Sequence, residues 1–419
     1  MDAVARTSRS LDGRTAGLGT AVAGMLLIAS TYGMARFGVG LFAPRLAVER
    51  PALADVVGLA AAAQFVSYSI AAGVAARLTD RRPRAGLLLA GLAATAGCLG
   101  VAAASTPAAF VGAVFVGGMG AGFASPALVR VVDAVVPERS SSTAQSLVNT
   151  GTAAGVVGAG LLTFATASTT PAWVLMAAAC AASAAGVLIL VRGRARTSTP
   201  AAPRTDVARG RRPRGRLALP SVAALVVGAG SALVWTFGPL LATGSGSVAA
   251  AQAGWLWIAL GVGGLLGPST GLVVDRLGPR RGWSLFAGVL VVADVLLGVA
   301  VVLDAAWAAY GSMAVFGAGY MCLSGVLILW ARAAWPSAAG AGTSVLFIAL
   351  AVGQAIGSVG FGAVRGGVPA VALVVAAASL CAVGGVLTAV AGRTAGYPKD
   401  GQRPQEPAPS ARALRSASR

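Results

Sequence analysis

Twelve long apolar runs decide what this chain can fold into. Each is roughly 20 residues or longer, the length that an α-helix needs to cross the hydrocarbon core of a bilayer. Of the 419 residues, 57% are hydrophobic and only 11% are charged, whereas soluble domains carry about 25% charged residues. The runs do not alternate in polarity as the strands of a membrane barrel would. Membrane-spanning helices are therefore predicted at 17–43, 54–77, 85–104, 107–129, 143–164, 171–191, 217–242, 250–273, 282–303, 305–331, 341–364 and 368–391.

Polar, arginine-rich segments flank and divide these runs. We expect 1–16 to be a cytoplasmic N-terminal tail, 192–216 a flexible basic linker, and 392–419 a disordered cytoplasmic tail. The linker separates an N-terminal six-helix half, 17–191, from a C-terminal six-helix half, 217–391. The apolar run after the first tail is too long for a signal peptide, so we interpret it as a retained helix. The predicted fold class is an all-α integral membrane protein.

The distribution of basic residues predicts the orientation. With the N-terminus in the cytoplasm, only Arg45, Arg50 and Arg365 lie outside and only Arg36 lies within the membrane. All the other Lys and Arg residues, of 32 in total, are then cytoplasmic, as the positive-inside rule requires. We therefore expect a plasma (inner) membrane protein with both termini in the cytoplasm. The net charge of +19 reflects topology rather than nucleic-acid binding.

Composition also excludes several functions. The chain has no histidine, and its only lysine is Lys399, so it lacks a Walker A phosphate-binding loop. Its four cysteines fall within apolar runs and match no metal or redox spacing. An enzyme embedded in the membrane would need a metal cluster, a histidine or paired carboxylates near one face. We therefore expect no enzymatic activity, no metal and no cofactor. The expected partners are a small-molecule solute and the lipid bilayer, with the chain functional as a monomer.

The two halves of the sequence repeat each other. Asp80, in the loop "RLTDRRPR", and Asp275, in the loop "GLVVDRLGPRR", are 195 residues apart, and so are Pro44 and Pro239. Two glycine-rich helices also correspond, with Gly151, Gly155, Gly158 and Gly160 in one and Gly353, Gly357, Gly360 and Gly362 in the other. Matches in the same order at a nearly constant offset indicate an internal repeat.

These loops resemble the hallmark loop of the major facilitator superfamily, Gly-x-x-x-Asp-Arg-x-Gly-Arg-Arg, and the resemblance covers about residues 17–391. It implies two six-helix halves related by pseudo-two-fold symmetry, with both loops acting as gates. The phrase "ARFGVGLFAP" is also similar to the first helix of bacterial YbfB/YjiJ-type members. The first loop has Ala76 and Pro83 where the family prefers glycine. The gating residues carried over are Asp80, Arg81, Arg84, Gly271, Asp275, Arg276, Gly278, Arg280 and Arg281.

The resemblance further implies a solute site near the midplane, between the halves. Polar and aromatic residues near helix centres are the candidates: Tyr32, Arg36, Gln64, Tyr68, Asn149, Trp235, Tyr320 and Gln354. Each buried amide needs a partner, either a solute or a neighbouring helix. Trp255 and Trp257 are predicted near the outer face, where an aromatic belt is expected.

Two charges fall inside predicted spans. An arginine at a helix centre costs about 2.5–3.5 kcal/mol on insertion scales. Arg36 could therefore face a cavity and anchor an anion, or extend its side chain to the outer interface. At the 195-residue offset its counterpart is Ser231, so the fold does not require this charge. Asp294 could serve proton coupling or bond to a neighbouring helix.

The expected function is secondary active transport of a small organic solute, anionic or zwitterionic, by alternating access and with proton coupling. Two alternatives remain open at this point. One is an exporter of drugs or toxic compounds with the same fold, and the other is a non-transporting membrane sensor or scaffold.

Overall fold

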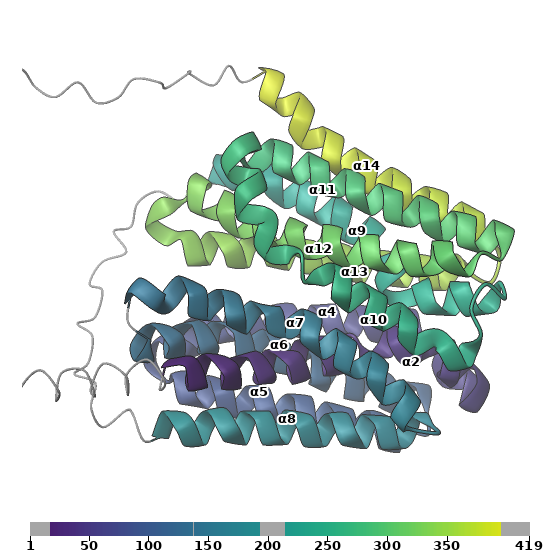
Figure 1. The fold of residues 1–419 in the computed structure, drawn as a ribbon, viewed down its shortest axis with the longest axis horizontal. Coiled ribbons are helices and arrows are strands. Elements are labelled where there is room, and N and C mark those ends of the chain that lie inside the picture. Colours follow the sequence, from purple (N-terminus) through teal and green to yellow (C-terminus); the bar gives the residue numbers. More distant parts are fainter. Residues whose placement is uncertain (1–16, 137, 193–213, 395–419) are drawn as a thin grey trace, which may run out of the picture.

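The structure is a computed structural model that describes residues 17–136, 138–192 and 214–394. The predicted N-terminal tail, the predicted C-terminal tail after residue 394 and nearly all of the predicted linker lie outside these residues, whereas 392–394, predicted as tail, are helical. Within the described ranges all regular structure is helical. Six membrane-spanning segments precede the segment 193–213 and lie together on one side of Figure 1, and the later ones lie on the other side.

The first half begins with helical residues 17–28, which continue into the π-helix η1. Residues 17–49 together form one candidate membrane span. The elements of this half are η1 (Ala29–Arg36), α2 (Gly38–Glu49), α3 (Pro51–Ala54), α4 (Val57–Arg81), α5 (Pro83–Ala103), α6 (Pro107–Val135), α7 (Glu138–Ala165) and α8 (Thr169–Arg192).

The second half contains three short 3₁₀ segments besides its long helices. Its elements are α9 (Arg214–Gly244), η2 (Ala250–Gln252), α10 (Ala253–Gly264), η3 (Gly267–Ser269), α11 (Thr270–Leu303), α12 (Ala306–Ala334), η4 (Pro336–Ala338), α13 (Ala339–Val364) and α14 (Ala370–Thr394). By length and composition, the described residues contain 11 candidate membrane spans, of which the stretch from Ala250 to Leu303 is one.

That longest stretch contains a break at Gly278. Its φ of 77° and ψ of 164° are not helical, and they divide α11 into two helices. Glycine adopts a positive φ without the steric cost that a side chain would add, and Pro279 then begins the next helix, a position that proline favours. The twelve predicted spans are thus confirmed, with the eighth and ninth joined at this turn.

The first loop makes its turn differently. Helix α4 ends at Arg81, Arg82 adopts a φ of −141°, and Pro83 opens α5. Because no residue in this turn needs a positive φ, the absence of the family's glycine at position 83 is structurally explained. Its departure from the motif therefore does not disturb the fold.

Glycines bring helices into backbone contact at corresponding places in the two halves. On α7, a Cβ at Gly155 would overlap the carbonyl of Ala29 in η1. On α13, a Cβ at Gly357 would overlap the carbonyl of Ala229 in α9 in the same way. Small residues at helix interfaces allow such close approach in membranes. These contacts support the internal repeat found in the sequence.

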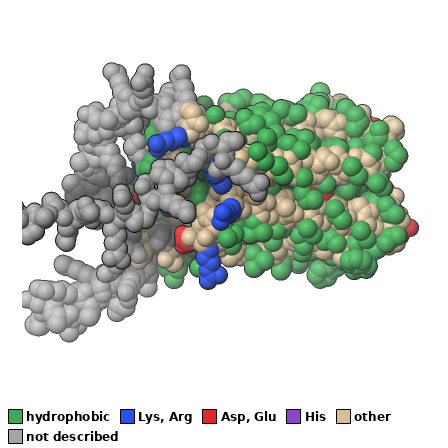
Figure 2. All heavy atoms as spheres, turned by 90° about the horizontal axis from the view of Figure 1, so that it is seen from above, with side chains coloured by type: hydrophobic (Ala, Val, Ile, Leu, Met, Phe, Trp, Pro, Cys, Tyr) green, Lys and Arg blue, Asp and Glu red, His purple; other side chains and the backbone are tan. Residues whose placement is uncertain are grey.

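The distribution of side chains agrees with a membrane location. Figure 2 shows a mostly hydrophobic flank, with arginine side chains gathered beside the segments drawn in grey. We call this end of the bundle, where α8 ends and α9 begins, the linker end. The opposite end, where α2 and α13 end, is called the far end. Among the described residues, Arg45, Arg50 and Arg365 lie at the far end.

Candidate functional site

The π-helix η1 is the most unusual local structure in the described chain. It spans Ala29–Arg36 inside the first membrane-spanning segment and so ends at the arginine that the sequence singled out. π-Helical turns are rare and occur frequently at functional sites. The carbonyl of Ala35, near the end of η1, accepts a hydrogen bond from Gln64 Nε2 at 3.4 Å. The amide of Gln64 thus has an interhelical partner.

Aromatic rings surround the guanidinium of Arg36. Its Cζ lies 4.1 Å from the ring centroid of Tyr68, 5.2 Å from those of Tyr32 and Phe65, and 5.1 Å from that of Phe37. The hydroxyl of Tyr32 donates to that of Tyr68 at 3.1 Å. Arg36 is only 6% exposed. We call these five residues the Arg36 cluster.

A second aromatic group in the other half joins the Arg36 cluster. Phe37 stacks on Trp235 of α9, with centroids 3.8 Å apart and planes 5° apart. Trp235 packs edge-on against Tyr320 of α12 at 5.2 Å, and the Tyr320 hydroxyl accepts a hydrogen bond from Gln354 Nε2 of α13 at 3.1 Å. Trp257 and Phe316 also contact the Trp235 ring, and with Trp235, Tyr320 and Gln354 they form the Trp235 cluster.

Several buried polar atoms in these two clusters have no hydrogen-bond partner among the described residues. They are Arg36 Nε, Trp235 Nε1, Trp257 Nε1 and Gln354 Oε1. The Tyr320 hydroxyl lies near the Trp235 indole N–H but outside hydrogen-bond geometry. No ion pair joins Arg36 to an acidic group of the described chain. Leaving a buried polar group unpaired costs about 1–3 kcal/mol, and more when it is charged.

Six of the eight candidate solute-binding residues belong to these clusters, and Gln64 lies beside them through its hydrogen bond to Ala35. The exception is Asn149, which is exposed on α7 and has no hydrogen bond to described residues. Sequence reasoning did not include Phe37, Phe65 and Phe316. Phe65 and Tyr68 are three residues apart, a spacing that places both on one face of α4, so this signal was available.

The tryptophans of α10 differ in their surroundings. Trp255 is 51% exposed, in agreement with a membrane-facing ring. Trp257 is fully buried, and its ring centroid lies 5.8 Å from that of Trp235. The expectation of an interfacial Trp257 is therefore wrong, because its side chain turns inward on the helix face opposite Trp255.

The packing register gives a different counterpart for Arg36 in the other half. Ala29 and Ala229, which contact corresponding glycines, are 200 residues apart. At this offset Arg36 corresponds to Thr236 instead of Ser231. Neither residue is charged, so the second half adopts its fold without a buried cation.

The proposed gating loops lie at the linker end, and their described residues form no contact between the halves. Asp275 and Arg276 are exposed and have no hydrogen bond or ion pair within the described chain. Arg84 donates to the carbonyl of Val191 in its own half at 3.0 Å. The side chains of Asp80 and Arg81 lie outside the described part of the structure.

Contacts between the halves, besides smaller ones at α2–α10 and α4–α9, are most extensive at three helix pairs, α2–α9, α4–α13 and α7–α10. Backbones meet at glycines in each pair. A Cβ at Gly40 would overlap the carbonyl of Trp235, and one at Gly160 would come within 2.7 Å of the carbonyl of Gly254. Gly58 and Gly362 approach each other at the far end. The halves therefore pack closely from the site to the far end.

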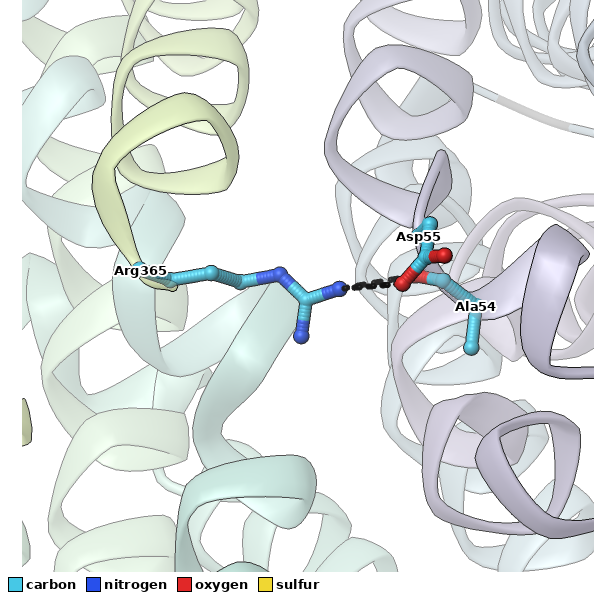
Figure 3. Close-up of polar contacts among 3 residues, drawn as sticks. All are labelled: Ala54, Asp55 and Arg365. Carbon is cyan, nitrogen blue, oxygen red and sulfur yellow. Dashed lines mark hydrogen bonds and ion pairs between the residues drawn. The ribbon is translucent and has the colours of Figure 1, made fainter. Parts of the chain in front are cut away.

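Arg365 adds a polar contact between the halves at the far end. It lies just after α13, and Figure 3 shows its side chain extending to Ala54, the last residue of α3, and to Asp55, which follows it. Its Nη2 donates to the carbonyl of Ala54 at 3.1 Å and lies 3.8 Å from Asp55 Oδ1. Its Cζ also lies 5.7 Å from the ring centroid of Phe237.

Asp294 lies apart from both clusters, on the second part of α11. It is 1% exposed, and neither carboxyl oxygen has a hydrogen-bond donor among the described residues. The thiol of Cys381 on α14 lies beside it without hydrogen-bond geometry. Within the described part of the chain, no group of three or more Cys, Asp or Glu side chains is arranged to hold a metal ion.

Comparison with known proteins establishes the family. The sequence model of the Major Facilitator Superfamily matches residues 25–358. The chain belongs to the major facilitator superfamily. A search of curated proteins finds no match, and the narrower resemblance to YbfB/YjiJ-type members stays a prediction. Members of this superfamily are transporters rather than enzymes, and the chain is accordingly a multi-pass membrane protein.

Solved structures of this superfamily share the fold at low sequence identity. The xylose transporter XylE from E. coli, in a partially occluded inward open conformation, has a TM-score of 0.70 and 16% identity over 93% of this chain and 100% of that chain. The nucleoside transporter NupG has a TM-score of 0.68 and 12% identity over 91% and 99%. A D-xylose-proton symporter has a TM-score of 0.68 and 16% identity over 89% and 96%. These identities establish the fold alone.

The far-end contact leads to a prediction in which the two partners of Arg365 differ. Asp55 is 81% exposed, and a surface ion pair contributes about 0–1 kcal/mol. A hydrogen bond involving a charged group contributes about 1.5–3 kcal/mol. Arg365→Ala should therefore move the far ends of the halves apart, whereas Asp55→Asn should leave them nearly unchanged. Spin labels at the exposed residues Val48 and Val368, one in each half, would report the distance between the far ends by double electron–electron resonance.

The four native cysteines are buried, so labelling would be directed to the introduced ones. Arg332→Ala is the matched control, because it removes an exposed linker-end arginine that makes no contact between the halves. If Arg365→Ala gave the wild-type distance distribution, the far-end contact would have no role in closing the halves.

Proposed function

We propose that this protein is a secondary transporter that carries a small organic anion by alternating access between its two halves. The observation that supports this most strongly is the buried guanidinium of Arg36, which has no counter-ion in the described chain and lies where the halves meet. Superfamily transporters bind solutes near the midplane, between their halves.

The energetics of Arg36 favour an anionic ligand. Removing a cation from water costs several kcal/mol even after the protein relaxes. A desolvated cation–π contact returns about 2 kcal/mol, so the surrounding rings offset part of that cost. A carboxylate would supply the opposite charge and bidentate hydrogen bonds. Because the guanidinium lies over the ring of Tyr68, its position supports a solute anchor rather than a side chain extended to the interface.

Neutral solutes suit this site less well. The neighbouring structures are a xylose transporter and a nucleoside transporter by name, and their identities to this chain are too low to transfer a substrate. A neutral sugar or nucleoside would leave the charge of Arg36 uncompensated. An anion removes that penalty, and this difference is the basis for the proposed substrate class.

The orientation follows from the same charge asymmetry that the sequence showed. We propose that the linker end faces the cytoplasm of a plasma membrane, because basic side chains gather there. The halves are packed together at the far end, while the described loop residues Asp275 and Arg276 are unpaired. This arrangement corresponds to a conformation closed to the outside. A transition to a conformation open to the outside would break the Arg365 contact and bring the linker-end loops together.

Transport in proteoliposomes provides the test. The probes are labelled lactate, succinate, benzoate and 4-hydroxybenzoate as anions, with xylose and uridine as neutral comparisons. We expect uptake of at least one anion and not of the neutral solutes. Arg36→Gln should lower its initial rate by about 10- to 100-fold, since one charge-assisted interaction contributes about 1.5–3 kcal/mol.

Arg332→Gln controls for the loss of a positive charge away from the site. Wild-type transport of an anion by Arg36→Gln would contradict the proposed role of Arg36. Carriage of xylose or uridine, with none of the anions transported, would contradict the proposed substrate class.

We further propose that transport is coupled to protons and that Asp294 carries the coupled proton. Its buried, unpaired carboxyl group supports this, because intramembrane carboxylates commonly serve as proton relays. Asp294→Asn should abolish the stimulation of uptake by an imposed pH gradient while preserving solute exchange at equal pH. Asp304→Asn is the control, because that exposed residue has a left-handed φ of 51° that asparagine tolerates. Retained stimulation in Asp294→Asn would exclude this residue as the proton carrier.

A further inference from the structure

Three buried polar side chains restrict what the site can bind beyond its need for an anion. Arg36 is 6% exposed, Trp235 is 3% exposed and Gln354 is fully buried. Each has a polar atom without a partner, namely Arg36 Nε, Trp235 Nε1 and Gln354 Oε1. The first two are donors, as is the unpaired Trp257 Nε1 of the same cluster, and the third is an acceptor. A bound solute that satisfies all three must therefore both accept and donate hydrogen bonds.

These three side chains belong to one contiguous cluster. Phe37, which follows Arg36, stacks on Trp235. Trp235 packs edge-on against Tyr320, whose hydroxyl accepts a hydrogen bond from Gln354 Nε2. The three unpaired atoms thus come from η1, α9 and α13, so a solute contacting all of them would bridge the halves.

The aromatic side chains of the two clusters favour a solute with a flat, apolar ring. The two clusters contain eight aromatic rings, and the Trp235 indole already stacks on the parallel ring of Phe37, with centroids 3.8 Å apart. Aromatic groups prefer such stacked or edge-on contacts, which add stabilisation beyond the buried area. A planar aromatic ring would make more of these contacts than an aliphatic body of the same size. The rings are Tyr32, Phe37, Phe65, Tyr68, Trp235, Trp257, Phe316 and Tyr320.

The solute group that donates a hydrogen bond to Gln354 Oε1 should be neutral. No acidic side chain of the described residues contacts either cluster, so an ammonium group would add a second uncompensated cation close to Arg36. Like charges in a poorly solvated site repel strongly. A hydroxyl or an amide N–H can donate to Gln354 Oε1 without this penalty. The cluster therefore disfavours zwitterionic amino acids, which the sequence alone left open.

We infer that the substrate class is an aromatic carboxylate that also bears a neutral hydrogen-bond donor. This inference rests on the proposed function and narrows it. The carboxylate would accept from Arg36 and the Trp235 indole N–H, the aromatic ring would stack within the two clusters, and the donor would reach Gln354.

Isothermal titration of the purified full-length protein with five probes tests each feature separately. The reference is 4-hydroxybenzoate. Benzoate lacks the donor, trans-4-hydroxycyclohexanecarboxylate lacks the aromatic ring, 4-hydroxybenzyl alcohol lacks the charge, and tyrosine adds an ammonium group. We expect 4-hydroxybenzoate to bind about tenfold or more tightly than each of the others, which is the effect of one such interaction.

Two variants locate the hydrogen bonds. Gln354→Leu should abolish the preference for 4-hydroxybenzoate over benzoate; the ratio of the two affinities is the readout, because the variant also removes the hydrogen bond from Gln354 to Tyr320. Trp235→Phe keeps an aromatic ring but removes the indole N–H, so it should weaken both acids equally. Trp255→Phe is the matched control, because that ring is half exposed and lies outside the two clusters.

The outcomes separate this inference from the proposed function. Equal affinity for the cyclohexane acid and 4-hydroxybenzoate, or tightest binding of tyrosine, would overturn the inferred class while leaving an anion site intact. Persistence of the hydroxyl preference in Gln354→Leu would also overturn it. Absence of binding by every carboxylate would overturn both the inference and the proposed function.

Discussion

A cation buried among aromatic rings without a counter-ion is the constraint on which the rest of this site depends. The guanidinium of Arg36 is nearly inaccessible and lies over four rings. Cation–π attraction offsets part of the cost of removing the guanidinium from water. A negatively charged ligand would offset the rest. An anion therefore stabilises the site more than a neutral ligand does. Because Phe37 of one half stacks on Trp235 of the other, a bound ligand affects both halves. A ligand can shift a conformational equilibrium only through such differential contacts.

The surrounding fold makes that arrangement possible through close helix packing. The π-helix η1 changes the direction of side chains over eight residues and ends at Arg36. Glycine at position 155 lets this segment lie directly against α7. Further glycines bring the halves together towards the far end, where Arg365 donates to the carbonyl of Ala54. Contacts of this kind can form in one conformation and break in another, which alternating access requires.

The sequence predicted the architecture well because its signals are local. Apolar length identified the twelve spans, and the glycine at 278 marked the turn that divides α11. The sequence also identified Arg36 as a candidate, since a charged residue within an apolar run is rare. The sequence did not predict η1, which packs against α7, or the burial of Trp257, which depends on how α10 is rotated. The Arg365 contact could not be predicted from the sequence either, because its main acceptor is the backbone carbonyl of Ala54 and any residue type carries a backbone carbonyl.

The central claim is that Arg36 meets the carboxylate of the substrate directly, and the Nε–H resonance of that residue tests it. In protein labelled with ¹⁵N-arginine, the Arg36 signal can be assigned by its loss in Arg36→Lys. Saturation with 4-hydroxybenzoate should shift this resonance and slow its exchange with water, because Nε has no hydrogen-bond partner among the described residues and a carboxylate would provide one. The same addition should leave the signal of Arg332 unchanged. An Arg36 resonance that does not respond while the protein binds or transports an organic anion would contradict the account.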